Sequence, residues 1–302
     1  MHLHSAAALI RDTRLHRALA RAVRVLASLA WLRLRGVTVI WTAHDLEDHD
    51  RERPGLEYAF TWALARTVSG ILAHGENASR LIARRFRLPR ARRPRCMPLP
   101  GADAKDAPSR AEARKRLLPR AGADDLVFLF LGSVKEYRGI HDLVDAFARI
   151  ARPGLHLVVR GVAKDAAVVD FLERAAARQP GIDVALGFVP EHEIADWMAA
   201  ADVVTAPYRR ILTSGSVALA ASHARAVVAP RTGAIPETLG DAVALLYDPD
   251  DPDGLDKALA RAVEERDALA DLGRRARRHV ERFTWDDAAR ETAAFYRALR
   301  GR

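Results

Sequence analysis

The stretch "LVFLFLGSVKEYRGIHDLVDAF", residues 126–147, decides the fold class. A strongly apolar run ends at Gly132, a short charged loop follows, and Gly139 opens a segment with helical spacing. A short apolar run bounded by glycine is typical of a buried strand in a parallel sheet, and an amphipathic segment directly after it predicts a helix. This strand–loop–helix unit therefore predicts an α/β fold.

The same alternation of strand and helix continues on both sides of that unit. We expect strands at 36–44, 70–74, 95–103, 126–132, 155–161, 182–188, 202–207, 226–230 and 242–249. Between them we expect helices, among them 56–69, 77–86 with Asn77 as the N-cap, 190–201 and 215–224, followed by 253–283 with a break and 285–300. Strands that alternate with helices predict parallel sheets covered on both faces. We therefore expect two Rossmann-like domains, 1–103 and 104–284, with a last helix, 285–302, that packs back across both.

Composition limits the class of protein. The 302 residues suffice for two domains with their own cores, and the single cysteine, Cys96, excludes a disulfide framework and a cysteine-built metal site. No apolar run reaches the length of about 18 residues that a membrane-spanning helix needs. The positive charge is uneven: residues 1–100 hold 18 Arg and no Lys against 8 acidic residues, whereas residues 101–302 hold 30 basic and 31 acidic residues. A basic first third points to a partner that carries phosphate.

Two basic segments account for much of this charge. Arginines at 11, 14, 17, 21 and 24 form one stripe of a predicted helix, with Leu15, Leu19, Val23 and Leu26 on another face. This helix is either an ordinary amphipathic surface helix or a helix that lies on a membrane. Residues 84–95 hold seven arginines and only one aromatic residue, Phe86. Such a run fits anionic lipid head groups or a solvated surface better than stacked nucleic-acid bases.

The loop after the strand at 126–132 is the first candidate site. Gly132 ends the strand, Lys135 and Arg138 lie on the loop, and Gly139 begins the helix. Two cations and the backbone N–H groups at a helix start could hold a diphosphate. The dinucleotide-binding pattern of three spaced glycines is absent. The alternative is a solvated loop.

The segment "LTSGSVALA", residues 212–220, is the second candidate site. Ser214 and Ser216 offer hydroxyl groups, and Gly215 allows a ligand to approach the backbone closely. The positive end of the helix dipole would favour an anion there. The alternative is a serine N-cap on a buried, alanine-rich helix.

The segment "TAHDLEDHD", residues 42–50, is the third candidate site. His44 and Asp48 have the spacing of metal ligands on a helix, but they directly follow a strand. No distal carboxylate–histidine pair completes a ligand set, so we expect no metal site. We expect His44 to be a polar group at a strand end that faces a cleft between the domains.

The order of these segments resembles the GT-B glycosyltransferases, and within them the family 4-like group that uses nucleotide-sugar donors. The resemblance rests on "GVTVIWTAHDLEDHD", on "LVFLFLGSVKEYRGIHDLVDAF", on "VPEHEIADWMAAADVVTAPY" and on "AVVAPRTGAIPETLGDAVALLYDPDDPDGLDKAL". It implies a GT-B fold and a donor site in the second domain. The start "MHLHS" looks like the middle of such a first domain, so we expect that domain to be incomplete or the sequence to be truncated at its beginning.

The resemblance also implies roles for single residues. Lys135 and Arg138 would neutralise the departing diphosphate without a metal or another cofactor, and His44 would act on the donor sugar. The donor would also contact Gly132, Ser133, Ser214, Gly215, Ser216 and Glu237. The sequence departs from the family pattern because Ser133 replaces a basic residue. It also lacks a pair of glutamates, since no acidic residue lies between Asp202 and Glu237.

The sequence thus predicts a metal-independent hexosyltransferase. The donor would be a nucleotide-diphosphate sugar, with GDP-mannose as one candidate, and the acceptor a lipid-linked or polysaccharide-precursor molecule. We expect a cytoplasmic protein at the inner face of the cell membrane, held there by its basic first domain, and no nucleic-acid partner. The alternatives are a non-catalytic GT-B remnant that binds a sugar nucleotide and, less favoured, an arginine-rich nucleic-acid-binding protein.

Overall fold

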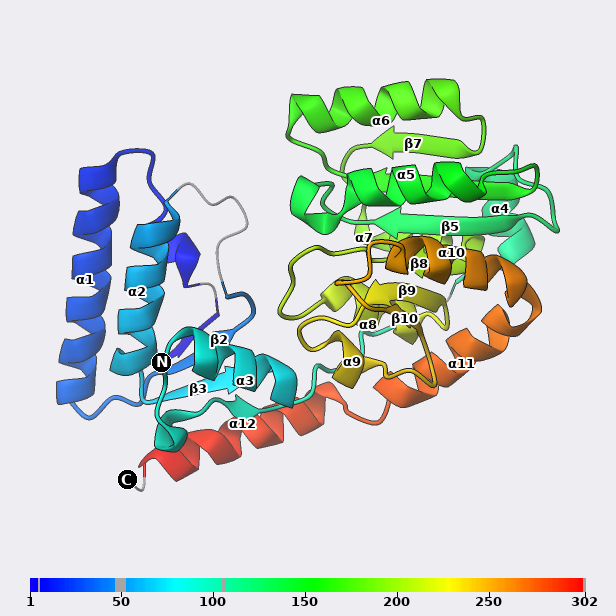
Figure 1. Cartoon of the computed structure of the whole chain (residues 1–302). Helices are drawn as coiled ribbons and strands as arrows, with labels where there is room; N and C mark the ends of the chain where they lie inside the picture. Colours follow the sequence, from blue (N-terminus) through cyan, green and yellow to red (C-terminus); the bar gives the residue numbers. More distant parts are fainter. Residues whose placement is uncertain (5, 47–52, 105–106, 301–302) are drawn as a thin grey trace. The chain divides into compact units, whose positions relative to one another are not determined.

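The chain forms two compact units (Figure 1). The computed structural model describes residues 1–4, 6–46, 53–104 and 107–300. Unit 1 comprises Met1–Leu99 together with Phe283–Arg302, and unit 2 comprises Pro100–Arg282. The expected division after residue 103 lies close to the observed one, and the last helix belongs to unit 1. Asp48 and His49 of the third candidate segment lie outside the described residues.

Unit 2 is built on a six-stranded parallel sheet. Its strands lie in the order β10-β9-β8-β5-β6-β7 and every recorded pairing is parallel. They span Leu126–Leu131 (β5), Leu155–Gly161 (β6), Ile182–Leu186 (β7), Val203–Thr205 (β8), Ala226–Pro230 (β9) and Leu245–Tyr247 (β10). The chain runs outward from β5 to β7, returns to β8 on the other side of β5, and continues outward to β10. The direction in which successive strands are added to the sheet therefore reverses between β5 and β8.

Helices cover both faces of this sheet, as the continuous apolar strands predict. The helices are α4 (Arg110–Leu117), α5 (Ile140–Ile150), α6 (Ala166–Arg178), α7 (Glu191–Ala200), α8 (Gly215–Ser222), α9 (Ile235–Thr238), α10 (Gly254–Glu264) and α11 (Leu269–Val280). In β5, Val127 and Leu129 join a core with residues of α7 and α8, whereas Phe128 and Phe130 join a second core with residues of α5, α6 and α10. All six residues of β5 are buried because neighbouring side chains point to opposite faces.

Unit 1 contains a four-stranded parallel sheet in the order β1-β2-β3-β4. The strands span His2–Leu3 (β1), Ile40–Ala43 (β2), Gly70–Ala73 (β3) and Arg95–Cys96 (β4), and the helices are α1 (Leu15–Leu34), α2 (Pro54–Thr67), α3 (Glu76–Arg85) and α12 (Trp285–Arg300). The α/β class and its parallel sheets are therefore confirmed. The fully buried side chains of unit 1 include Trp41, Phe60, Leu64 and Phe86.

Helix α12 lies against β3. A Cβ atom added to Gly70 would come within 2.6 Å of the Phe295 ring, so only glycine leaves room for that ring. Arg95 and Glu291 form an ion pair with an N–O distance of 3.2 Å, and Thr292 donates a hydrogen bond to the sulfur of Met97 at 3.6 Å. The end of the chain thus completes the first unit.

Two local predictions were wrong. Asn77 is not an N-cap, since α3 begins at Glu76 after Gly75, whose φ of +110° suits glycine. The arginine stripe is also shorter than expected, because α1 begins at Leu15 and Arg11 and Arg14 precede it. In both places the start of the helix depends on the backbone conformation just before it, and the spacing of side chains along the sequence does not predict that conformation.

Helix α1 exposes its apolar face. Leu15, Leu19 and Val23 are 55%, 45% and 68% exposed. The buried residues of this helix are Ala18, Ala22 and Leu29, of which two are small. Among the described residues, no helix is long and apolar enough to cross a membrane. The apolar face of α1 is therefore a surface feature of unit 1.

Candidate functional site

The strand order of unit 2 places a site at the carboxyl ends of β5 and β8. In open parallel sheets, ligands bind at the point where the strand order reverses, because loops from the two neighbouring strands leave in opposite directions there. The loop after β5 spans residues 132–139 and the loop after β8 spans residues 206–214. These loops hold two of the three candidate segments.

Glycines bring the strand ends unusually close together. Gly161, at the end of β6, has a φ of +142°, and a Cβ atom there would lie 1.6 Å from the carbonyl oxygen of Gly132. Gly139 has a φ of +72°, and its Cβ atom would lie 1.9 Å from the carbonyl oxygen of Pro207. Any side chain at either position would force the backbones apart. Gly139 thus fixes the loop after β5 against the loop after β8.

Arg138, Gly132 and Ser216 converge at this point. A Cβ atom on Gly132 would lie 3.2 Å from Arg138 Nη1 and 3.8 Å from Ser216 Oγ. The guanidinium of Arg138 therefore lies over the bare backbone at the end of β5, beside the first turn of α8. A cation, a backbone without a side chain and a helix N-terminus together provide positive potential for an anion.

Helix α8 begins with a capped and open first turn. Ser214 accepts a hydrogen bond from Val217 N at 3.2 Å and donates one to the hydroxyl of buried Tyr208 at 3.4 Å. Apart from its chain neighbours and its own helix, no atom of the described residues lies within 4 Å of a Cβ position on Gly215, so the space above this turn is open. Ser214 thus holds the helix start inside the protein, and Gly215 and Ser216 face the open side.

An aromatic and an ionic contact hold the two loops together. Arg138 Cζ lies 5.3 Å from the centroid of the Tyr208 ring. Arg209 donates to both carboxylate oxygens of Asp142, at 2.6 and 2.7 Å, and its backbone N–H donates to Tyr137 O at 3.1 Å. The hydrogen bonds that Arg209 donates to Asp142 raise the pKa of Arg209 above its ordinary value. The Tyr208 ring thus contacts Arg138 directly, while Arg209 joins the loop after β8 to α5 and to the loop after β5.

For the other predicted donor-site residues, the structure gives no comparably close approach to Gly132 and Arg138. Ser133 is half-buried directly after Gly132, and Lys135 lies with its Nζ 5.9 Å from the Tyr137 ring centroid. Glu237 is exposed on α9, after the loop that follows β9. The structure thus brings together Gly132, Arg138, Ser214 and Ser216. Lys135 lies on the same loop as Arg138, and Glu237 lies on α9.

His44 lies in unit 1, in a row of four histidines. The register that pairs Ala43 with Ala73 places His44 and His74, the next residues, side by side at the carboxyl ends of β2 and β3. Their ring centroids are 5.3 Å apart. His4 Nδ1 lies 3.2 Å from His44 Nε2, and the rings of His2 and His4 stack at 4.4 Å.

Three of the four histidines in this row have pKa values below the ordinary one. Burial, followed by repulsion from His44, lowers the pKa of His74 to about 4, and His74 is 5% exposed. Burial, followed by repulsion from His4, lowers the pKa of His2 to about 4 and also lowers that of His44. A neutral imidazole at the end of β2 can accept a proton or a hydrogen bond near neutral pH.

Within the described part of the chain, no group of three or more His, Cys, Asp or Glu side chains is arranged to hold a metal ion. The rings of His2 and His4 and those of His4 and His44 stack, whereas the rings of His44 and His74 are tilted.

Sequence reasoning missed His4, His74 and Tyr208. His74 directly follows the predicted strand 70–73, so the rule that selected His44, a polar residue at a strand end, would also have selected His74. No sequence pattern identifies Tyr208 as the ring beside Arg138, since that contact depends on the packing of two loops.

Comparison with known proteins agrees with this architecture. Residues 125–265 match the protein family described as "Glycosyl transferases group 1". Most of the second unit thus matches a glycosyl transferases group 1 domain. The resemblance to that group, first drawn from four segments of sequence, is confirmed.

The matches to curated relatives cover only part of the length of those relatives. The "GDP-mannose:glycolipid 4-beta-D-mannosyltransferase" of Xanthomonas campestris pv. campestris is 31% identical over 123 residues, which cover 40% of this chain and 35% of that protein. The "D-inositol 3-phosphate glycosyltransferase" of Streptomyces avermitilis is 34% identical over 211 residues, which cover 64% of this chain and 43% of that protein. The chain therefore spans less than half the length of these two relatives.

Solved structures share the fold across nearly the whole chain. Sucrose-phosphate synthase from Thermosynechococcus elongatus superposes with a TM-score of 0.76 at 20% identity, covering 96% of this chain and 80% of that one. Anabaena HepE in complex with UDP superposes with a TM-score of 0.74 at 18% identity, covering 92% and 77%. At this identity the likeness shows the fold, and the GT-B prediction is confirmed.

Proposed function

We propose that this chain is a glycosyltransferase that moves a hexose from a nucleotide-diphosphate sugar to a lipid-linked or polysaccharide-precursor acceptor. The observation that carries the proposal is the convergence of Arg138, Gly132 and Ser216 at the point where the strand order of unit 2 reverses. The family of residues 125–265 supports it independently.

The chemistry of glycosyl transfer matches such a site. The bond between the anomeric carbon and the diphosphate oxygen breaks, and its electron pair leaves with the nucleotide diphosphate. An acceptor hydroxyl oxygen forms the new bond to that carbon and loses its proton. Preorganised cations and N–H groups stabilise the charge that develops on the leaving group. Arg138 and the first turn of α8 would supply this positive potential.

The remaining predicted residues have roles that the resemblance implies. Lys135 would add a second cation on the same loop, Ser133 and Gly215 would contact the diphosphate, and Glu237 would bind a hydroxyl of the donor. A role for His44 at the donor sugar stays a prediction, supported by its neutral state. Because cations of the protein would neutralise the diphosphate, we expect turnover to persist in EDTA.

GDP-mannose is one candidate donor. The name of the Xanthomonas relative specifies GDP-mannose and a glycolipid, whereas the Anabaena structure holds UDP, so both nucleotides need to be tested. Because GDP and UDP differ in their bases, guanine and uracil, a preference for one of them would identify the nucleotide of the donor.

Calorimetric titration with GDP and with UDP tests the donor site. We expect saturable binding of one nucleotide and a loss of roughly ten- to a hundred-fold in affinity for Arg138→Ala, since a charge-assisted hydrogen bond contributes about 1.5–3 kcal/mol. The control is Arg178→Ala, which removes an exposed arginine at the end of α6. Equal affinity in both variants would contradict a cradle at Arg138.

Turnover separates an enzyme from a binding remnant. The absence of acidic residues between Asp202 and Glu237 favours the remnant as a second candidate. Sugar transfer from labelled GDP-mannose or UDP-glucose to a membrane lipid extract would establish the enzyme. Nucleotide binding that depends on Arg138, without transfer from any donor, would establish the remnant. Nucleic-acid binding that falls steeply with salt, without nucleotide binding, would support the third alternative.

We also propose a peripheral position at the cytoplasmic face of the membrane. The exposed leucines and valine of α1 lie on a helix that also carries exposed Arg17, Arg21 and Arg24. Apolar side chains beside arginines favour insertion between anionic head groups. Co-sedimentation with phosphatidylglycerol vesicles should fall for Leu19→Glu/Val23→Glu and persist for Ala293→Glu/Ala294→Glu on α12. Equal sedimentation of both variants would contradict contact through α1.

A further inference from the structure

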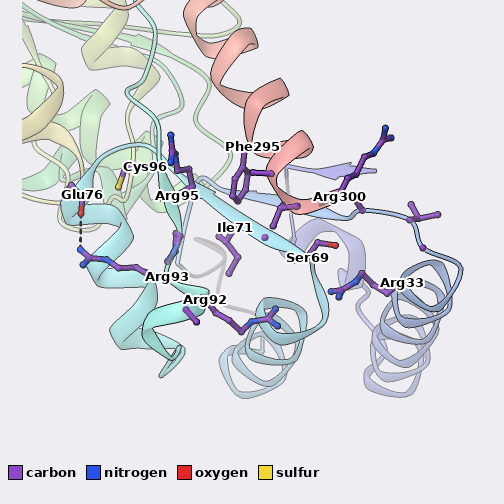
Figure 2. A pocket seen from close by; sticks show the side chains of 18 residues that line it. Arg33, Ser69, Ile71, Glu76, Arg92, Arg93, Arg95, Cys96, Phe295 and Arg300 are labelled. Carbon is purple, nitrogen blue, oxygen red and sulfur yellow. Dashed lines mark hydrogen bonds and ion pairs between the residues drawn. The ribbon is translucent and has the colours of Figure 1, made fainter. Parts of the chain in front are cut away.

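A groove in unit 1 has a lining that the donor chemistry does not use. Its volume is about 800 Å³, and it starts beside Thr38 and Ser69, the residues just before β2 and β3, and extends along β4 to Cys96 (Figure 2). His44 and His74 lie at the opposite, carboxyl ends of β2 and β3. The groove is therefore separate from the histidine row. Its volume is in the range of small-molecule sites.

Five arginines line this hollow, which we call the arginine groove. They come from three segments of the chain: Arg33 from the end of α1, Arg92, Arg93 and Arg95 from the arginine-rich run, and Arg300 from α12. Figure 2 shows these side chains around the groove, with Phe295 and Ile71 between them. Of the described residues that line the groove, Glu76 alone is acidic. The arginine-rich run therefore contributes to a concave surface as well as to an exposed one.

The partners of these arginines leave a positive surplus. Arg93 pairs with Glu76 at 2.9 Å, and Arg95 pairs with Glu291 at 3.2 Å. Arg33 donates instead to Thr67 O at 2.8 Å. A backbone carbonyl orients a guanidinium without neutralising its charge.

Arg92 is held in the same way, by Val68 O at 2.7 Å and Ala65 O at 3.2 Å. Burial, followed by repulsion from Arg33 and Arg66, lowers the pKa of Arg92 below its ordinary value. Neighbouring cations that repel one another around a hollow create a region where an anion is favoured.

The floor of the groove is apolar and closely packed. Phe295 lies against Gly70, where a Cβ atom would come within 2.6 Å of its ring. Ile71 is 3% exposed at the base, and Leu299 lines the wall from α12. Guanidinium groups around an apolar floor suit a ligand with an anionic group and a less polar body. Arginine's planar set of donors matches the oxygens of phosphate.

We propose that the arginine groove binds a phosphate-bearing ligand at a site separate from the sugar-nucleotide site. The phosphate group lies among the guanidinium groups of the arginine groove, and the remainder of the ligand lies over Phe295. Two sources share this chemistry, the phosphate head group of an anionic lipid and a free phosphorylated molecule. The proposal does not depend on the glycosyltransferase assignment.

Binding of inorganic pyrophosphate and of vesicles tests this proposal and separates the two sources. Both are measured in the Arg138→Ala background, so that the proposed donor cradle does not contribute. The vesicles are an equal mixture of phosphatidylcholine and phosphatidic acid, compared with phosphatidylcholine alone. The test variant is Arg33→Gln/Arg300→Gln. The control is Arg24→Gln/Arg297→Gln, which removes two exposed arginines from the same helices, α1 and α12, outside the groove.

We expect the test variant to bind the probe roughly ten-fold or more weakly than the control, because two charge-assisted contacts are lost. Dependence of pyrophosphate binding on Arg33 and Arg300 identifies a free phosphorylated ligand. Dependence of vesicle binding alone identifies a lipid head group. Arg33→Lys/Arg300→Lys should retain part of the binding, and equal thermal unfolding would show that all variants are folded. Equal binding of both probes by the test and control variants overturns the proposal.

Discussion

Lowering the pH should destabilise unit 1 through His74. The ordinary histidine pKa is 6.5, and burial lowers that of His74 to about 4 in the folded chain. Between these values the unfolded chain binds more protons than the folded one, so the stability is fully present above pH 6.5 and is lost as the pH falls toward 4. Linkage over this interval gives a loss of about 2 kcal/mol between pH 7.5 and pH 5.

Urea unfolding at several pH values checks this expectation in the wild type and in His74→Asn. The variant removes the titrating ring but leaves His44 and His4 in place, so its stability should fall less steeply by about 2 kcal/mol over the same interval. His16→Asn, which changes an exposed histidine on α1, is the control and should keep the wild-type slope. A proton NMR titration of the His74 ring should give a midpoint well below 6.5.

Equal slopes for the wild type and His74→Asn would refute the reasoning. They would mean that the ring of His74 titrates alike in the folded and unfolded chain, so that burial between β3 and its neighbours imposes no cost on the charged form. The absolute stability of the variant does not enter this comparison, since only the dependence on pH is read.

Three further changes test the packing of unit 2, each by urea unfolding. Gly139→Ala should cost at least about 1 kcal/mol from its positive φ alone, and more because its Cβ would meet Pro207 O; wild-type stability would contradict that contact. Arg114→Met should cost about 3 kcal/mol, because it removes the buried partner of Asp202, and a stable variant would show that the pair is dispensable. Ser109→Ala should cost about 1 kcal/mol by removing the capping box of α4, whereas no change would indicate a frayed helix start.

Local pattern was sufficient for most of the order of elements, although the strand β1 at His2–Leu3 was not predicted. Apolar runs such as 126–131 are buried on both faces, and helical spacing reports one buried side of a helix, so both signals are present in neighbouring residues. The N-cap of α3 was predicted wrongly because the choice between Gly75 and Asn77 depends on a backbone angle.

Part of the candidate site was visible for the same reason. Gly132, Arg138 and Ser216 were identified because each lies at a strand end or a helix start, where the fold class predicts ligands. The distances between these residues could not be predicted, because Ser216 lies near Gly132 only as a result of the pairing of β8 with β5 in the sheet.

The sequence by itself determined the α/β class, the two-unit organisation of parallel strands and the concentration of arginine in the first hundred residues. Only the tertiary structure decided that His4, His44 and His74 form one row and that Arg33, Arg92 and Arg300 line one groove. The physical reason is the range of the interactions. Helices and strands follow from contacts within a few residues, whereas parallel register and the packing of α12 join residues that are distant along the chain.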